Sequence, residues 1–132
     1  MARVAQVNPS PPARTVLRRA ALVALGGMLG TAARMGLGML IPDAALGVLV
    51  ANLAGALLLG VITARLPASD LRVCAGTGVL GGFTTYSAFA VDSVQLWASA
   101  PLLSIGYVGL SLVVGIAAAA LGLHLGRKRA RA

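Results

Sequence analysis

Residues 76–89 concentrate glycine and threonine inside an otherwise apolar stretch, which reads GTGVLGGFTTYSAF. Each glycine weakens a helix by about 1 kcal/mol relative to alanine. The pattern therefore predicts a helix interrupted near its centre, with a kinked but continuous helix as the alternative. An interruption frees carbonyls that can bind a cation, and it creates a second helix start whose amides favour an anion. Thr84 or Thr85 is suited to cap that second half.

Among the polar side chains within the apolar stretches, Arg34, Asn52 and Asp92 are the ones we single out. A charge at the centre of a membrane helix costs about 2.5–3.5 kcal/mol on insertion scales, so such a residue usually faces water or a partner. Arg34 is thus expected either to attract an anion or to pair with Asp92. Asn52 can donate its amide hydrogens to a passing anion or bind a neighbouring helix.

The sequence contains little that an enzyme uses. It has one histidine and three acidic residues. Gly76, Gly78 and Gly81 spell the spacing of a dinucleotide-binding loop, but no strand precedes them and no acidic residue follows at the required distance. We therefore predict that the protein is not an enzyme.

Four apolar stretches carry the polar residues, at 20–40, 44–64, 73–98 and 102–125. The chain of 132 residues is 58% hydrophobic and only 11% charged, against roughly 45–50% and 25% in soluble domains. About 20 apolar residues cross a bilayer as a helix. The sequence thus predicts an all-α membrane protein with four transmembrane helices, the third broken near its centre.

The basic residues separate the two sides of the membrane. Every lysine and arginine except Arg34 lies in the tails or in the connection at 65–72, and the other two connections have none. Because basic loops stay in the cytoplasm, both termini are predicted to be cytoplasmic. We expect a disordered basic tail at 1–19, a four-helix transmembrane domain at 20–126 and a basic tail at 127–132. The net charge of +8 suits anionic lipid better than nucleic acid.

Four motifs in order along the chain resemble those of the fluoride ion channel family, known as Fluc or CrcB. They begin at Gly26 in the first stretch, Asn52 in the second, Gly81 in the third and Tyr107 in the fourth. Their residues are Gly26, Gly27, Gly30 and Arg34; Asn52, Gly55 and Gly60; Gly81 to Phe89 with Asp92; and Tyr107, Ser111 and Gly115. The resemblance covers residues 20–126.

The resemblance implies a dimer of antiparallel, dual-topology subunits in the bacterial cytoplasmic membrane, with multiple membrane passes and two fluoride pores. It implies passive, selective fluoride efflux that protects the cell from fluoride toxicity. A structural sodium ion (Na+) would bind at the dimer interface to the backbone carbonyls of Gly81 and Thr84. Arg34 would attract anions at a vestibule, and the fluoride pathway would be lined by Asn52, Tyr86, Ser87, Phe89, Tyr107 and Ser111.

Three positions depart from the family pattern: Tyr86 replaces a phenylalanine, Ala88 a hydroxyl residue and Asp92 a glutamate. The one-sided basic charge suits a subunit of fixed orientation, so an oppositely oriented homologue is an alternative partner to a second copy. A membrane subunit with a scaffold role is a further alternative. A small drug exporter is less favoured, because exporters of this size use a carboxylate in the first span, where this chain has Arg34.

Overall fold

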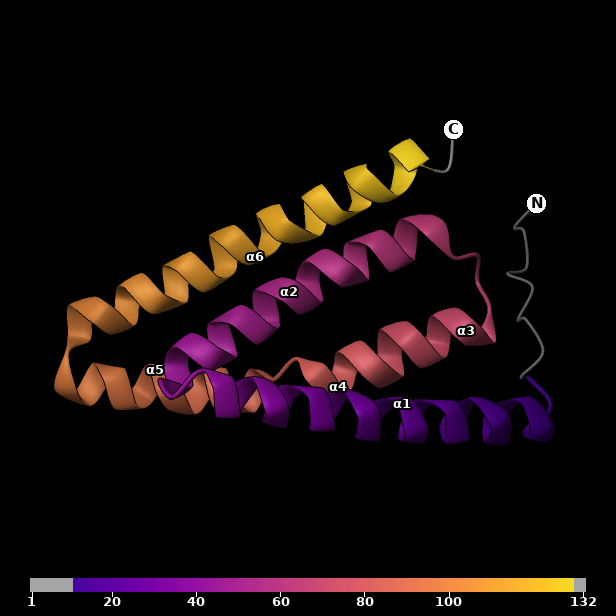
Figure 1. The fold of residues 1–132 in the computed structure, drawn as a ribbon, viewed down its shortest axis with the longest axis horizontal. Coiled ribbons are helices and arrows are strands. Elements are labelled where there is room, and N and C mark those ends of the chain that lie inside the picture. The colour runs from indigo at the N-terminus through magenta and orange to yellow at the C-terminus, as the bar shows by residue number, and fades with distance from the viewer. Residues whose placement is uncertain (1–10, 130–132) are drawn as a thin grey trace, which may run out of the picture.

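The described part of this computed structural model covers residues 11–129, all of it helical apart from short connections (Figure 1). Two long helices come first, α1 (Ala13–Leu40) and α2 (Ala44–Arg65). The short helix α3 (Asp70–Arg72) leads into the third apolar stretch, which follows in pieces: a π-helix η1 (Val73–Leu80), α4 (Gly81–Phe83) and α5 (Tyr86–Ser99). The last helix is α6 (Pro101–Arg129).

Among the residues that the structure describes, three helices are long and apolar enough to cross a membrane, namely α1, α2 and α6. The third apolar stretch is divided into two shorter helical parts: η1 with α4 packs along α1, whereas α5 packs against α6 and α2 (Figure 1). The start of α1, the connection between α2 and α3 and the end of α6 lie at one end of the molecule (Figure 1). This end carries those basic residues within 11–129 that the charge pattern assigned to the cytoplasm.

Both helical ends of the chain extend further than the composition suggested. The basic tail was expected to reach residue 19, but α1 begins at Ala13, directly after the extended Pro12. Arginine is a good helix former, and Arg18 and Arg19 both pair with Asp70 of α3, which holds this turn against the rest of the chain. At the other end α6 continues to Arg129. Residues 1–10 and 130–132 lie outside the described range.

Glycines mark the places where helices touch. α2 packs along α6, and α1 packs along η1 and α4. A side-chain carbon on Gly122 of α6 would overlap the carbonyl of Leu57 on α2, and one on Gly82 of α4 would overlap the carbonyl of Gly27 on α1. Small residues at these contacts bring the helix backbones close enough for van der Waals packing.

Large apolar side chains face outward instead of forming a core. Among the described residues the buried hydrophobic side chains are Ala51 and Leu80, whereas Leu102 is 87% exposed and Met39 is 82% exposed. A surface this apolar is suited to lipid or to a partner chain. The fold is thus organised around glycine contacts inside and hydrophobic side chains outside.

Candidate functional site

The predicted break in the third apolar stretch is confirmed at Thr84 and Thr85. Both residues have extended backbones, with φ −83° and ψ 158° at Thr84 and φ −148° and ψ 120° at Thr85. Thr85 is the residue that caps the second half, because its hydroxyl accepts a hydrogen bond from the amide of Ala88 at 3.2 Å. A continuous kinked helix, the alternative for this stretch, is excluded by these angles.

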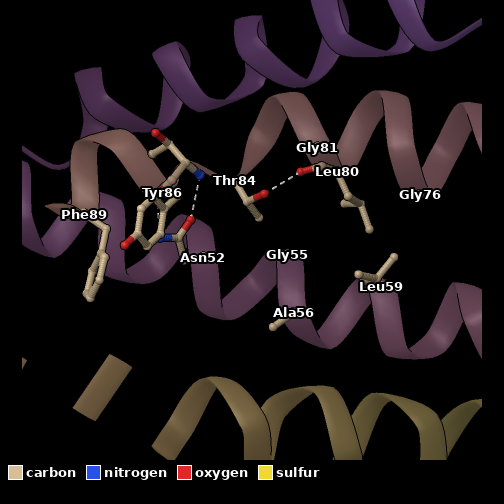
Figure 2. A pocket seen from close by; sticks show the side chains of 11 residues that line it. Asn52, Gly55, Ala56, Leu59, Gly76, Leu80, Gly81, Thr84, Tyr86 and Phe89 are labelled. Atoms are coloured by element: carbon tan, nitrogen blue, oxygen red, sulfur yellow. Dashed lines mark hydrogen bonds between the residues drawn. The ribbon is translucent and has the colours of Figure 1, made fainter. Parts of the chain in front are cut away.

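Asn52 holds the break from the neighbouring helix α2. Its amide oxygen accepts the backbone N–H of Thr85 at 2.8 Å, and its amide nitrogen donates to the carbonyl of Thr85 at 3.0 Å (Figure 2). The side chain therefore substitutes for a backbone partner of an extended residue. One of the two amide hydrogens of Asn52 is used in this way, which leaves the second for another acceptor.

Thr84 turns its hydroxyl back toward the first half of the broken helix. The backbone N–H and the hydroxyl of Thr84 both donate to the carbonyl of Leu80, each at 2.9 Å. The break also needs Gly55 on α2, because a side-chain carbon there would overlap the methyl group of Thr84. Glycine at this position lets α2 approach the extended backbone, which the spacing of the second motif alone did not indicate.

A third carbonyl at the break is engaged from α1. The carbonyl of Gly82 accepts from Arg34 Nε at 3.3 Å and from the Thr31 hydroxyl at 3.4 Å. Within residues 11–129 both ion pairs use Asp70, so the alternative pairing of Arg34 with Asp92 is not formed. Thr31 was missed by the sequence argument. Thr31 lies three residues before Arg34, so both side chains share one helix face, and this spacing could have identified it.

An open groove of about 380 Å³ runs between α2 and the broken helix; we call it the central groove (Figure 2). It brings together five of the predicted site residues: Asn52, Gly81, Thr84, Tyr86 and Phe89. Its other lining residues are Gly55, Ala56, Leu59, Gly76, Leu80 and Thr85. Polar backbone and two aromatic rings thus share one mostly apolar channel-like depression.

Four predicted residues lie outside the lining of the central groove. Arg34 lines a separate hollow of about 290 Å³ near Gly38 and Pro42. The hydroxyl of Ser111 donates to the carbonyl of Tyr107 at 2.7 Å, within its own helix. The hydroxyl of Ser87 lies 3.2 Å from that of Thr85.

Aromatic rings continue the groove toward α6. The ring centroids of Tyr86 and Phe89 are 6.0 Å apart, and those of Phe89 and Tyr107 are 5.5 Å apart. The hydroxyl of Tyr107 is buried without a hydrogen-bond partner in the described part of the chain, and so is one carboxylate oxygen of Asp92. Buried polar atoms without partners are rare, and each calls for an explanation such as a bound water or ion.

The fold and this groove define a multi-pass helical membrane protein with a mostly apolar groove, lined by two aromatic rings, beside a broken helix. Residues 21–123 match the family described as "CrcB-like protein, Camphor Resistance (CrcB)". The chain belongs to this family.

Curated relatives come from several bacteria. A protein of Paracoccus denitrificans named "Fluoride-specific ion channel FluC" is 45% identical over 113 residues, which are 80% of this chain and 91% of that protein. A protein of the same name from Agrobacterium fabrum is 43% identical over 118 residues, covering 81% and 94%. "Fluoride-specific ion channel FluC 1" of Rhodococcus jostii is 44% identical over 109 residues, covering 82% and 85%. Together with the three apolar helices of this chain, these bacterial relatives identify it as a multi-pass bacterial membrane protein.

Proposed function

We propose that this chain forms a fluoride-selective channel that lets fluoride leave the cell passively and so protects it from fluoride. The observation that carries the proposal is the central groove, where the Asn52 amide and the rings of Tyr86 and Phe89 meet beside a broken helix. The names of the relatives supply the ion, because a groove of this kind does not by itself distinguish fluoride from another small anion.

The groove offers fluoride partial replacements for its water shell. Transfer of a small bare anion into an apolar medium costs tens of kcal/mol. The free hydrogen of the Asn52 amide is one donor, and the positively polarised edges of Tyr86 and Phe89 are further contacts. The unpartnered hydroxyl of Tyr107 lies next along the row of rings. Several weak sites in sequence permit both entry and release, which conduction requires.

The broken helix also has carbonyls that suit a structural sodium ion. Those of Gly81 and Thr84 accept no hydrogen bond from described residues, and both residues line the central groove. Carbonyl oxygen is a hard, neutral ligand of the kind that binds alkali and alkaline-earth cations. The donor set thus fits sodium, which when bound would add fixed positive charge beside the anion path.

We further propose that the broken third stretch crosses the membrane as a fourth span and that two subunits pair in opposite orientations. The central groove is open, and Tyr86 at its edge is 81% exposed, so a second subunit is needed to close it. Since the basic residues lie at one end of the molecule, one orientation is favoured for this chain. The partner is therefore a reoriented copy or an oppositely oriented homologue.

The test is fluoride efflux from liposomes that contain the purified chain, followed with a fluoride electrode and with chloride as the control ion. Fast efflux of fluoride over chloride is expected. Asn52→Asp should stop the flux, because a carboxylate puts negative charge into the path and removes the free amide hydrogen, while Gln95→Glu on the exposed face of α5 should leave it unchanged. Equal flux in Asn52→Asp would remove the donor role.

A silent wild-type chain calls for a second arm, in which an oppositely oriented homologue is reconstituted together with it. Efflux from the pair and not from either chain alone would establish a heterodimeric channel. Silence of every pairing would contradict the channel proposal and favour a scaffold subunit.

A further inference from the structure

The break in the third stretch frees several backbone carbonyls, and the neighbouring helices occupy some of them selectively. Thr84 and Thr85 are extended. The backbone N–H groups of residues 85 and 86 are therefore turned away from the carbonyls of residues 81 and 82, which they would bond in a regular helix. The carbonyl of Leu80 keeps its helical partner, the backbone N–H of Thr84, and the carbonyl of Thr85 is bound by Asn52 of α2. The carbonyl of Gly82 is taken by Thr31 and Arg34.

The carbonyl of Gly82 differs from those of Gly81 and Thr84 because its hydrogen-bond donors come from α1. Gly82 faces α1, where a side-chain carbon would overlap the backbone of Gly27. A side-chain carbon on Gly81 would meet open space, and Gly81 lines the central groove together with Thr84. The two donors on α1 therefore fasten the carbonyl of Gly82, a residue that, unlike Gly81 and Thr84, does not line the groove.

We infer that Arg34 and Thr31 are positioning residues for the proposed sodium site: by holding the Gly82 carbonyl on α1, they fix the carbonyls of Gly81 and Thr84 toward the groove. The inference rests on the proposed function. Arg34 is half-buried in an apolar helix and needs an acceptor, while Gly82 has a carbonyl that needs a donor. The hydrogen bond between them therefore lowers the cost of burying both the guanidinium of Arg34 and the carbonyl of Gly82.

A positioning role and a purely electrostatic role of Arg34 predict opposite changes in sodium affinity when the side chain is removed. A guanidinium near a cation site repels the cation, so its removal would tighten sodium binding if charge were the whole effect. If Arg34 positions the carbonyls, its removal weakens sodium binding instead. Loss of partners that orient metal ligands typically lowers metal affinity by about 10-fold or more.

The experiment is thermal unfolding of the full chain in detergent, with sodium titrated against N-methylglucamine at constant ionic strength. Sodium should stabilise the wild type, because it binds the folded state. Arg34→Leu should raise the sodium concentration at half-effect by about 10-fold or more, and Thr31→Val by about threefold, as for one neutral hydrogen bond. Thr31→Ser restores the hydroxyl and should match the wild type. Arg65→Gln removes an exposed charge outside this cluster and should also leave the midpoint unchanged.

The outcomes separate this inference from the proposal beneath it. A midpoint that is unchanged in both variants, or that falls in Arg34→Leu, overturns the positioning role while the sodium site stands. A wild type whose unfolding does not respond to sodium overturns the sodium site and the positioning role with it, while fluoride efflux is judged separately in liposomes. If Arg34→Leu does not fold, Thr31→Val against Thr31→Ser carries the same test.

Discussion

The pair α2–α6 and the pair formed by α1 with the broken helix solve the same packing problem in different ways. Between α2 and α6 regular helices meet through glycine, as where Gly60 and Gly122 face each other's backbones. Between α1 and the broken helix glycine contacts occur too, but Thr31 and Arg34 add hydrogen bonds to exposed backbone. Non-helical backbone at membrane depth needs such partners, whereas an intact helix satisfies itself. The α2–α6 interface is thus held by close packing, whereas the α1 interface also fastens backbone next to the break.

The largest effect is expected where a glycine is replaced at the α2–α6 interface. Gly122→Leu forces a side chain into the backbone of Leu57, and overpacking of this kind costs about 1–3 kcal/mol or more. We expect loss of monodisperse, folded protein in size-exclusion chromatography. Gly109→Leu on the same helix meets open space and is the matched control. Normal folding of Gly122→Leu would show that the two helices can separate without harm.

A smaller but more specific effect is expected at the clamp between Asn52 and Thr85. Asn52→Leu removes two hydrogen bonds and leaves backbone groups of Thr85 without partners, which costs about 1–3 kcal/mol for each buried group. The melting temperature should fall and fluoride efflux should be lost. The same exchange at exposed Gln95 should change neither. Retained efflux in Asn52→Leu would mean that the break keeps its shape without the clamp.

The cap of the second half-helix comes next in size. Thr85→Val removes the acceptor for the amide of Ala88, and loss of such a cap typically costs about 1 kcal/mol. Thermal unfolding should show this decrease, and Thr85→Ser should restore the wild-type value. If valine and serine behave alike, the Thr85 hydroxyl does not stabilise α5.

The smallest effect is expected at the basic end of the molecule. Asp70 pairs with Arg18 and Arg19, whose side chains are 66% and 46% exposed, and exposed pairs contribute below about 1 kcal/mol. Asp70→Asn should therefore lower the melting temperature slightly at low salt and not at high salt, since salt screens exposed charges. An equal decrease at both salt concentrations would point to the helix start at Ser69 instead of the ion pairs.

Much of the architecture was predictable because its signals are local. The apolar stretches and the prolines and charges between them predicted the three long helices, with the end of α1, both ends of α2 and the start of α6 near those observed. The glycine and threonine run predicted the interruption, and the alternatives Thr84 and Thr85 for the cap included the correct one. The start of α1 was predicted too late, because arginines read as a tail can equally continue a helix.

Sequence alone determined which segments are apolar helices, where one of them is interrupted and which end carries the charge, because these follow from composition and spacing within a few turns. Only the tertiary structure decided the partner of each polar group: Arg34 binds Gly82 across 48 positions, and Asn52 binds Thr85 across 33. The reason is physical. A buried polar side chain bonds to whatever backbone the helix packing brings within about 3 Å, and that packing depends on which glycine faces meet.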